Sequence, residues 1–413
     1  MRTAAGGSMH CGAFVLMTAA LCGIASPSAA AENAGVLERL EAVGAKSSFA
    51  DGGAGDANSL TEIVIADGSQ LTAADITAIG RLPTLRALQI HNCRTLDDAA
   101  VTALAGLARL DTLALTNSSL TDAAVETIAT AFQRLVDLDL SSNANMTGAA
   151  LKWISGLEHL ERLGLLQNRF NDLNTRRLAK LQALEVLDLR GNMEAGDMTL
   201  DVLGKLPKLR ALKHRSTTVT DEGIERLATS PSLAAFLLQD FAITDAAGPA
   251  LARIGTLESL EIFRCQGFGT AGVQSLAPLK NLGRLTLRDL PEVGDAGLAV
   301  LADLPALERL TLHELASVGD EGLRHLGAVT GLEVLDIWSL PKMTDATIEV
   351  ITALPAIKDL SIRETGVTDA GLAKLAALRG LESLTFKDNG PITSATREKL
   401  ESRNLKKLDL GTK

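Results

Sequence analysis

A phrase of 24 or 25 residues recurs from Leu60 to the end of the chain. Each copy begins with the pattern Leu-x-x-Leu-x-Leu, passes through a short turn and continues as an apolar residue followed by Thr-Asp-Ala-x-Leu-x-x-Leu. The first apolar residue of the copies falls at positions 60, 85, 110, 135, 160, 184, 209, 233, 257, 282, 307, 332, 357, 381 and 405. A unit this short cannot bury its own apolar side, so the copies must stack into a solenoid with one continuous core.

The two halves of the phrase have different periods. The fourth and sixth residues of the first half, such as Leu335 and Ile337, point to one side of an extended segment, which predicts a strand. Leu372 and Leu375 in the second half are spaced i, i+3, which predicts a helix. The pair Thr368-Asp369 just before it offers a hydroxyl and a carboxylate to the free N–H groups of that helix. Each repeat is therefore a strand, a turn, a helix and a return loop.

This reading divides the chain into four parts. Residues 1–31 predict a signal peptide, and residues 32–59 predict a capping helix followed by a turn. Residues 60–404 hold fourteen repeats of 24–25 residues, and residues 405–413 form a terminal strand and tail. The expected fold class is α/β, with a parallel concave sheet of about 15 strands and short convex helices.

The recurring Val-Thr-Asp-Ala-Gly-Leu phrase, complete at residues 367–372, resembles the leucine-rich-repeat family, and in particular its bacterial, planctomycete-type members. It is also similar to the cysteine-containing, ribonuclease-inhibitor-like subclass. The resemblance implies a right-handed horseshoe that binds a protein or another ligand on its concave face. It does not name the ligand.

The family often carries Asn or Cys eight residues after the first Leu, where the side chain bonds to the backbone of the next turn. Repeated along the chain, these side-chain bonds form a polar ladder. The C-terminal half departs from that pattern, so we expect apolar packing to replace part of the ladder there. The Asn members are Asn143, Asn168, Asn192 and Asn389, the Cys members are Cys93 and Cys265, and the apolar replacements are Phe241, Leu290, Leu315 and Leu340.

Cys93 and Cys265 lie seven repeats apart. With strands about 4.8 Å apart, this places them on the order of 30 Å from each other. A disulfide needs Cα atoms within roughly 7 Å, so we expect two free, buried thiols.

The N-terminus has the features of an export signal. Arg2 supplies a positive charge, residues 13–24 form an apolar run, and Ala29-Ala30-Ala31 is a small-residue cleavage site. We therefore expect a secreted or periplasmic protein with no membrane span after cleavage, and an uncleaved anchor is the alternative. Loss of Arg2 changes the formal net charge from −10 to −11, which disfavours nucleic acid and anionic membranes as partners.

No catalytic motif is found in the sequence. It contains no G-x-x-x-x-G-K-[ST], G-x-S-x-G, H-E-x-x-H or C-x-x-C, and aromatic residues make up only 3 % of the chain. We therefore expect no enzyme activity, no cofactor and no metal. Asp137, Asp139 and Asp188 would suit calcium, but Arg162 and Arg190 sit among them and favour a solvated charge network.

His214 is the one exception to the Leu, Ile or Phe at the sixth strand position. One interpretation is a buried, neutral histidine bonded to a backbone group. The other is a distorted strand that presents Lys213, His214 and Arg215 to a ligand.

The seventh position of each strand phrase faces the inside of the arc, where the core does not require it. In the C-terminal half this position predicts a stripe of cationic and aromatic side chains, the types that most often anchor interfaces. The members of this concave stripe are Arg215, Phe263, Arg288, His313, Trp338, Arg363 and Lys387, with Gln239 between the first two and with Arg264, Arg284 and Arg309 beside it. A solvated ladder of arginines stacked on aromatic rings is the alternative.

These features favour a monomeric, non-enzymatic interaction scaffold that binds a protein, acidic in character, or an anionic glycan. Two alternatives remain open. One is a substrate-recognition adaptor or effector of the ubiquitin-ligase-adaptor type. The other is a recognition module that assists a hydrolase of the cell envelope.

Overall fold

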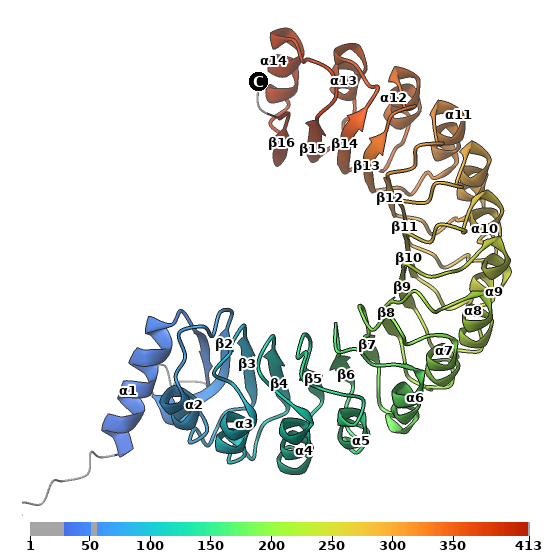
Figure 1. Cartoon of the computed structure of the whole chain (residues 1–413). Coiled ribbons are helices and arrows are strands. Elements are labelled where there is room, and N and C mark those ends of the chain that lie inside the picture. Colours follow the sequence, from blue (N-terminus) through green and yellow to red (C-terminus); the bar gives the residue numbers. More distant parts are fainter. Residues whose placement is uncertain (1–28, 51–55, 412–413) are drawn as a thin grey trace, which may run out of the picture.

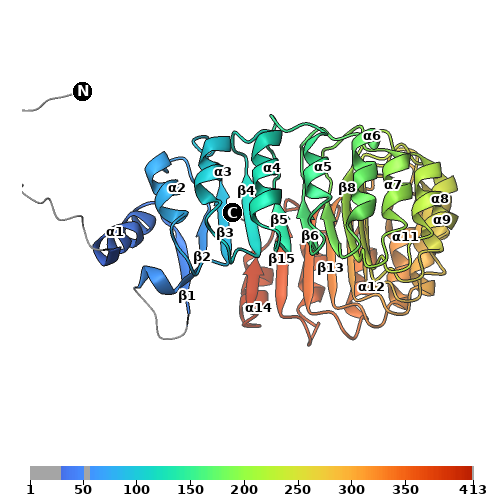
Figure 2. The same cartoon turned by 90° about the horizontal axis from the view of Figure 1, so that it is seen from below.

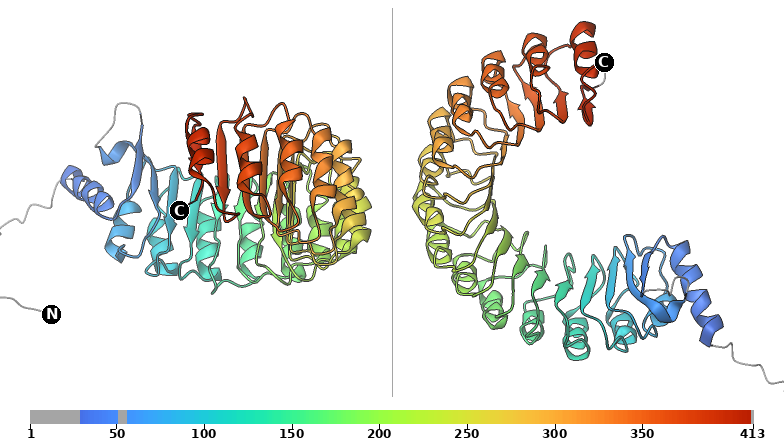
Figure 3. Two further views of the ribbon diagram at one scale, coloured as in Figure 1. Left: turned by 90° about the horizontal axis from the view of Figure 1, so that it is seen from above. Right: turned by 180° about the vertical axis from the view of Figure 1, so that it is seen from behind.

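The computed structural model describes residues 29–50 and 56–411. The chain forms an open arc in which one sheet lines the inner face and the helices lie on the outer face (Figure 1). The helices of successive repeats form a row along the outside of this arc (Figures 2 and 3). The predicted signal peptide lies outside the described residues except for its last three, which belong to the first helix, Ala29–Ala42.

Within the described residues the sheet has 16 strands, and each strand pairs with the next one along the chain. The first strand, β1, is antiparallel to β2, and the pairs from β2 to β16 are parallel. The strands are β1 (Lys46–Phe49), β2 (Leu60–Ile65), β3 (Ala87–His91), β4 (Thr112–Thr116), β5 (Asp137–Asp139), β6 (Arg162–Gly164), β7 (Val186–Asp188), β8 (Ala211–Arg215), β9 (Ala235–Gln239), β10 (Ser259–Phe263), β11 (Arg284–Arg288), β12 (Arg309–His313), β13 (Val334–Leu340), β14 (Asp359–Thr365), β15 (Ser383–Lys387) and β16 (Lys407–Asp409). The predicted set of about 15 parallel strands is confirmed, with one antiparallel strand before it.

The convex side is built from short α-helices and 3-10 turns. The α-helices are α1 (Ala29–Ala42), α2 (Ala73–Ile79), α3 (Asp98–Leu104), α4 (Asp122–Ala131), α5 (Ala150–Ile154), α6 (Asp172–Thr175), α7 (Asp197–Leu203), α8 (Asp221–Leu227), α9 (Gly248–Ala252), α10 (Thr270–Gln274), α11 (Asp320–Leu323), α12 (Asp345–Thr352), α13 (Asp369–Leu375) and α14 (Ser394–Glu401). The 3-10 segments are η1 (Ala57–Ser59), η2 (Arg176–Lys180), η3 (Asp245–Ala247), η4 (Asp295–Asp303) and η5 (Arg324–Ala328).

The core is one layer of stacked aliphatic side chains between the sheet and the helices. The fourth and sixth strand residues pair in register across repeats, as Leu310 does with Leu335 and Leu312 with Ile337. All four are fully buried. A single cluster of buried side chains extends from Leu40 to Leu410, so the repeats share one core.

The turn after each strand carries the expected polar ladder in the N-terminal half. Asn143 Nδ2 donates to the carbonyls of Leu115 and Leu140 at 2.8 and 2.9 Å, and Oδ1 of Asn168 accepts from the Asn143 N–H at 3.0 Å. The two cysteines at this position are free and fully buried. The apolar replacements of the C-terminal half, Phe241, Leu290, Leu315 and Leu340, are also buried, so packing replaces these hydrogen bonds.

Candidate ligand-binding face

The residues of the concave stripe stand side by side across successive strands. Phe263 pairs with Arg288, and Arg288 pairs with His313. His313 pairs with Trp338, which in turn pairs with Arg363. Arg363 pairs with Lys387, and Gln239 connects Arg215 to Phe263 at the other end. The strand register therefore brings all seven predicted residues into one row on the inner face of the arc.

Guanidinium groups stack on both aromatic rings of the row. The Cζ atoms of Arg264 and Arg288 lie 4.3 and 4.5 Å from the centre of the Phe263 ring. The Cζ atom of Arg288 also lies 5.3 Å from the centre of the Trp338 ring. The Cζ atom of Arg363, on the strand after that of Trp338, lies 5.6 Å from the same ring centre. Cation–π contacts of this kind contribute about 0.5–1 kcal/mol at exposed sites and favour the stacked orientation. The stacked ladder considered from sequence is therefore present, and it gives the surface a defined shape.

The cations of the row are paired with carboxylates. Arg288 Nε lies 2.9 Å from Glu314, and Arg363 Nη2 lies 3.0 Å from Asp336. Arg215 and Arg264 share Asp240, and Lys387 pairs with Asp409. The stripe is thus a row of neutralised cations in fixed positions. The sequence placed Asp289, Glu314 and Glu364 beside the stripe as acids that partly neutralise it. Glu314 does form an ion pair with the row, and Asp240, Asp336 and Asp409 supply the other carboxylates.

Several of these acids occupy a strained backbone conformation. The residue directly after the row has a positive φ in most repeats, including 60° at Asp240 and 55° at Glu314. Glycine and asparagine adopt this left-handed region most easily, and acidic or longer side chains do so at a cost. The turn therefore places the Asp240 and Glu314 carboxylates beside the row.

His313 is largely buried in the row, with 12 % of its side chain accessible. Its Nε2 lies 2.9 Å from Asp336 Oδ2, and its ring meets the Trp338 ring edge-on at 5.6 Å. Burial alone would raise the pKa of Asp336, but hydrogen bonds from His313, Ser361 and Arg363 outweigh it and lower the pKa to about 2. Asp336 is therefore ionised at neutral pH and fixes both His313 and Arg363.

His214 lies beneath the concave face and is fully buried. Its Nε2 is 2.8 Å from the Ala195 carbonyl oxygen, and its ring meets Phe241 edge-on at 5.3 Å. Burial lowers its pKa, although hydrogen bonds to the Ala195 and Leu189 carbonyls act the other way. Strand β8 stays in register with β9 through His214 and Leu238, so there is no local distortion that would present His214 to a ligand.

The N-terminal half of the concave face is a charge network. Arg162 pairs with Asp137 at 2.8 Å, and Arg190 pairs with Asp188 at 2.6 Å. Within residues 29–50 and 56–411, no group of three or more His, Cys, Asp or Glu side chains is placed to hold a metal ion. The same residues include no helix that is long and apolar enough to cross a membrane.

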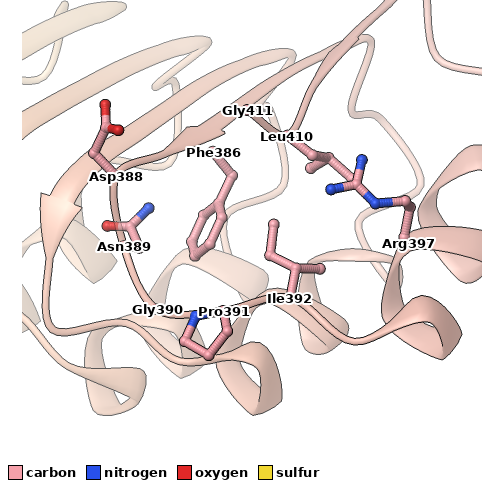
Figure 4. Close-up of a pocket in the computed structure, with 9 residues that line it drawn as sticks. All are labelled: Phe386, Asp388, Asn389, Gly390, Pro391, Ile392, Arg397, Leu410 and Gly411. Atoms are coloured by element: carbon pink, nitrogen blue, oxygen red, sulfur yellow. The ribbon is translucent and has the colours of Figure 1, made fainter. Parts of the chain in front are cut away.

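A cavity of about 460 Å³ lies near the C-terminal strands (Figure 4). It is formed by the turn after β15, helix α14 and the segment after β16, and Phe386, Ile392 and Arg397 are among its lining residues. Asp388 and Arg397 are the only ionisable side chains in the lining, so it offers no nucleophile with a neighbouring base.

The comparisons with known proteins agree with this architecture. The family model described as leucine rich repeat matches residues 133–193. The sequence matches no curated protein.

Three solved structures illustrate the likeness of the fold. An internalin, InlF from Listeria monocytogenes, is 20 % identical with a TM-score of 0.54, and the match covers 86 % of this chain and 95 % of the internalin. Rad7 in its yeast complex with Elc1 is 19 % identical with a TM-score of 0.51, over 69 % and 77 % of the two chains. TLR13 in complex with ssRNA13 is 20 % identical with a TM-score of 0.53, over 76 % of this chain and 51 % of TLR13.

At these identities the similarity concerns the fold alone. The recurring strand phrase, the parallel concave sheet and the matching family model agree with one another. The chain therefore folds as a leucine-rich-repeat solenoid, and residues 133–193 match the leucine-rich-repeat family model.

Proposed function

We propose that this protein is a non-enzymatic interaction scaffold that binds a protein ligand through the concave stripe. The observation that supports this most is the stacked row Arg264–Phe263–Arg288–Trp338–Arg363, which is held rigid by ring contacts and ion pairs. Rigid aromatic and arginine side chains lose little entropy when they bind, and they dominate the binding energy of many interfaces.

The core does not require these side chains. Phe263 and Trp338 are only half-buried, whereas Ile262 and Ile337, which precede them in their strands, are fully buried. A contiguous aromatic surface left in water by a soluble chain usually marks an interaction site. The related folds support a binding role in general terms, since Rad7 was solved with Elc1 and TLR13 with an RNA. The acidic net charge of this chain favours a protein over a nucleic acid.

We further propose that the protein acts outside the cytoplasm, in the periplasm or in the extracellular space. Support comes from the sequence of residues 1–31, with Arg2, an apolar run and an Ala-Ala-Ala end. N-terminal sequencing of the protein purified from cell envelope and medium fractions tests this, and a mature N-terminus near Glu32 is the expected result. Recovery of the intact N-terminus would favour the anchored alternative.

The binding proposal is tested by affinity capture from the native envelope fraction. The wild-type protein should retain a partner that the Arg288→Ala/Trp338→Ala variant loses. Arg324→Ala/Trp153→Ala serves as the matched control, because it removes the same residue types from convex segments. Equal capture by the wild type and the stripe variant would move the binding surface away from this face.

A further inference from the structure

We propose that Arg284, Thr286, Arg309 and Thr311 form an anion-binding subsite next to the concave stripe. The class of ligand is a tetrahedral oxyanion, a phosphate or sulfate group carried by the partner. The inference rests on the proposed function, because the subsite would hold one group of a partner that also contacts the stripe.

The subsite is built from two copies of one phrase. Strand β11 reads Arg284-Leu285-Thr286-Leu287-Arg288, and strand β12 reads Arg309-Leu310-Thr311-Leu312-His313. The two strands pair without a shift, so Arg284 stands beside Arg309 and Thr286 beside Thr311. Alternation along the strands places all of these polar side chains on the concave face, about 4.8 Å apart from strand to strand.

The two arginines differ from the other arginines on the concave strands. Arg162, Arg215, Arg288 and Arg363 each form an ion pair with a carboxylate. Within the described part of the chain, Arg284 and Arg309 form no ion pair and no side-chain hydrogen bond, and both side chains are exposed. Two like charges directly opposite each other on neighbouring strands repel, and an anion placed between them would remove that repulsion.

The neighbours of the two arginines in the sheet are uncharged. Ser259 stands beside Arg284, and Val334 stands beside Arg309. A bound oxyanion would therefore meet no carboxylate in this column of side chains. The hydroxyls of Thr286 and Thr311, which have no hydrogen-bond partner among the described residues, lie one step further along the same strands and can donate to it.

Four carboxylates lie close enough to matter. Glu258 and Glu308 line a hollow of about 370 Å³ together with Arg284, Glu261 stands beside Thr286, and Asp336 stands beside Thr311. None of the four forms an ion pair with Arg284 or Arg309, and Asp336 is already bonded to His313 and Arg363. Glu258 and Glu308 directly precede their strands, are exposed, and face the hollow beside Arg284. Glu261 and Asp336 flank the two threonines, so the anion is expected between the two guanidinium groups.

The number and type of donors favour a tetrahedral oxyanion over a carboxylate. Two guanidinium groups can each offer a pair of parallel N–H donors, and the hydroxyls add two more. A carboxylate has two oxygens to receive them, whereas a phosphate or sulfate ester has three oxygens that are free to accept.

Titration of the full-length protein with inorganic phosphate, sulfate and acetate tests the subsite. Chloride at equal ionic strength provides the background, and the arginine Nε–H signals in NMR spectra provide the readout. The signals of Arg284 and Arg309, assigned with single Arg→Lys variants, should shift and saturate with phosphate or sulfate. Affinity should fall about tenfold or more in Arg284→Gln/Arg309→Gln, since two charge-assisted contacts are lost. A preference between phosphate and sulfate would identify the group.

Arg253→Gln/Arg324→Gln is the matched control, because both residues lie on the convex side and should leave the titration unchanged. Shifts that do not saturate, or that acetate reproduces at equal concentration, would overturn the subsite. The titration needs no partner, so its failure is distinct from that of the stripe. If the wild-type protein binds no anion but its partner capture still depends on the stripe, the subsite alone is rejected. If the wild-type protein binds the anion but partner capture does not depend on the stripe, the stripe alone is rejected.

Discussion

Asp345 accepts two hydrogen bonds from Thr368 of the following repeat, one from its backbone N–H at 2.8 Å and one from its hydroxyl at 2.6 Å. Thr368 caps its own helix, since its Oγ1 accepts from the Ala370 N–H. The sequence pattern had suggested that both members of a Thr-Asp pair serve the helix that follows them. That prediction was right for the threonine and wrong for the aspartate, which connects two repeats.

The same bond recurs along the convex rim, and we call it the Asp–Thr ladder. Its other members with bonds to both the Thr N–H and the Thr hydroxyl are Asp98–Thr121, Asp122–Thr147, Asp197–Thr220, Asp221–Thr244, Asp320–Thr344 and Asp369–Thr393. The ladder connects neighbouring repeats at the helix N-termini, where free N–H groups favour a negative charge.

The ladder leads to a prediction about Gly371. A Cβ at this position would overlap Asp345 Oδ1 and lie 2.8 Å from Asp345 Cγ. Alanine normally stabilises a helix relative to glycine by up to about 1 kcal/mol. Here we expect Gly371→Ala to lower the free energy of unfolding by about 1–2 kcal/mol, because the methyl group displaces a carboxylate held by two hydrogen bonds. Chemical denaturation measures the change.

A double-mutant cycle with Asp345→Ala separates this effect from simple crowding. Once the carboxylate is absent, Gly371→Ala should become neutral or stabilising, so that the two substitutions are strongly non-additive. Glu308→Ala is the control, because Glu308 is exposed and lies outside the ladder. Additive effects of the two substitutions would show that the contact between Gly371 and Asp345 is unimportant.

Period and composition were sufficient to predict the solenoid. In each copy of 24 or 25 residues, apolar residues recur every second position in the first half and every third or fourth position in the second half. This pattern leaves one way to stack the copies. The use of Asp345 could not be read from the sequence of one repeat. Its partner lies 23 residues away, and the same Thr-Asp pair is also a standard helix cap.

His214 provides a test of stability. Because the other repeats carry Leu, Ile or Phe at this position, the sequence alone would lead one to expect that His214→Leu preserves or raises stability. The bond from Nε2 to the Ala195 carbonyl reverses this expectation, because leucine would leave that buried oxygen without its donor. We expect a loss of about 1 kcal/mol at pH 7, measured by urea denaturation.

The same residue should make stability depend on pH. Burial lowers the pKa of His214 in the folded state, so the unfolded state binds its proton first on acidification. The stabilisation is complete above the unfolded pKa of about 6.5 and is lost as the pH falls below it. Between pH 7.5 and 5.5 the wild type should therefore lose more stability than His214→Leu. Parallel curves for the two proteins would contradict this.

Cys265 should be inert in the native protein. Burial raises the pKa of its thiol to about 12, and the thiolate is the reactive form. Iodoacetamide at pH 8 should leave the peptide that contains Cys265 unmodified in the native protein and modify it fully in guanidinium chloride, as detected by mass spectrometry. Rapid labelling under native conditions would mean that this repeat opens locally.

The row of the candidate site was predictable, because alternation and repeat length place the seventh residue of each strand phrase on the inner face. Its charge balance was predictable only in part. Glu314 was expected from the sequence to neutralise the row in part, whereas Asp240 in the turn and Asp336 at the fifth strand position were not singled out. Whether a side chain at these positions turns toward the row depends on backbone angles such as the positive φ of Glu314, which sequence alone does not specify.

Arg288 allows the stacked geometry of the stripe to be separated from its charge. It lies between the Phe263 and Trp338 rings, and Glu314 already neutralises it. Against a partner identified by affinity capture, Arg288→Ala and Trp338→Ala should each cost about 1–3 kcal/mol of binding free energy, with unchanged thermal unfolding.

Arg288→Lys keeps the charge but loses the flat guanidinium that stacks on the rings and donates from Nε. It should therefore weaken binding nearly as much as alanine does, in calorimetric titrations at low salt. Near wild-type affinity for Arg288→Lys, together with a steep loss of binding in added salt, would instead mean that the partner recognises the positive charge.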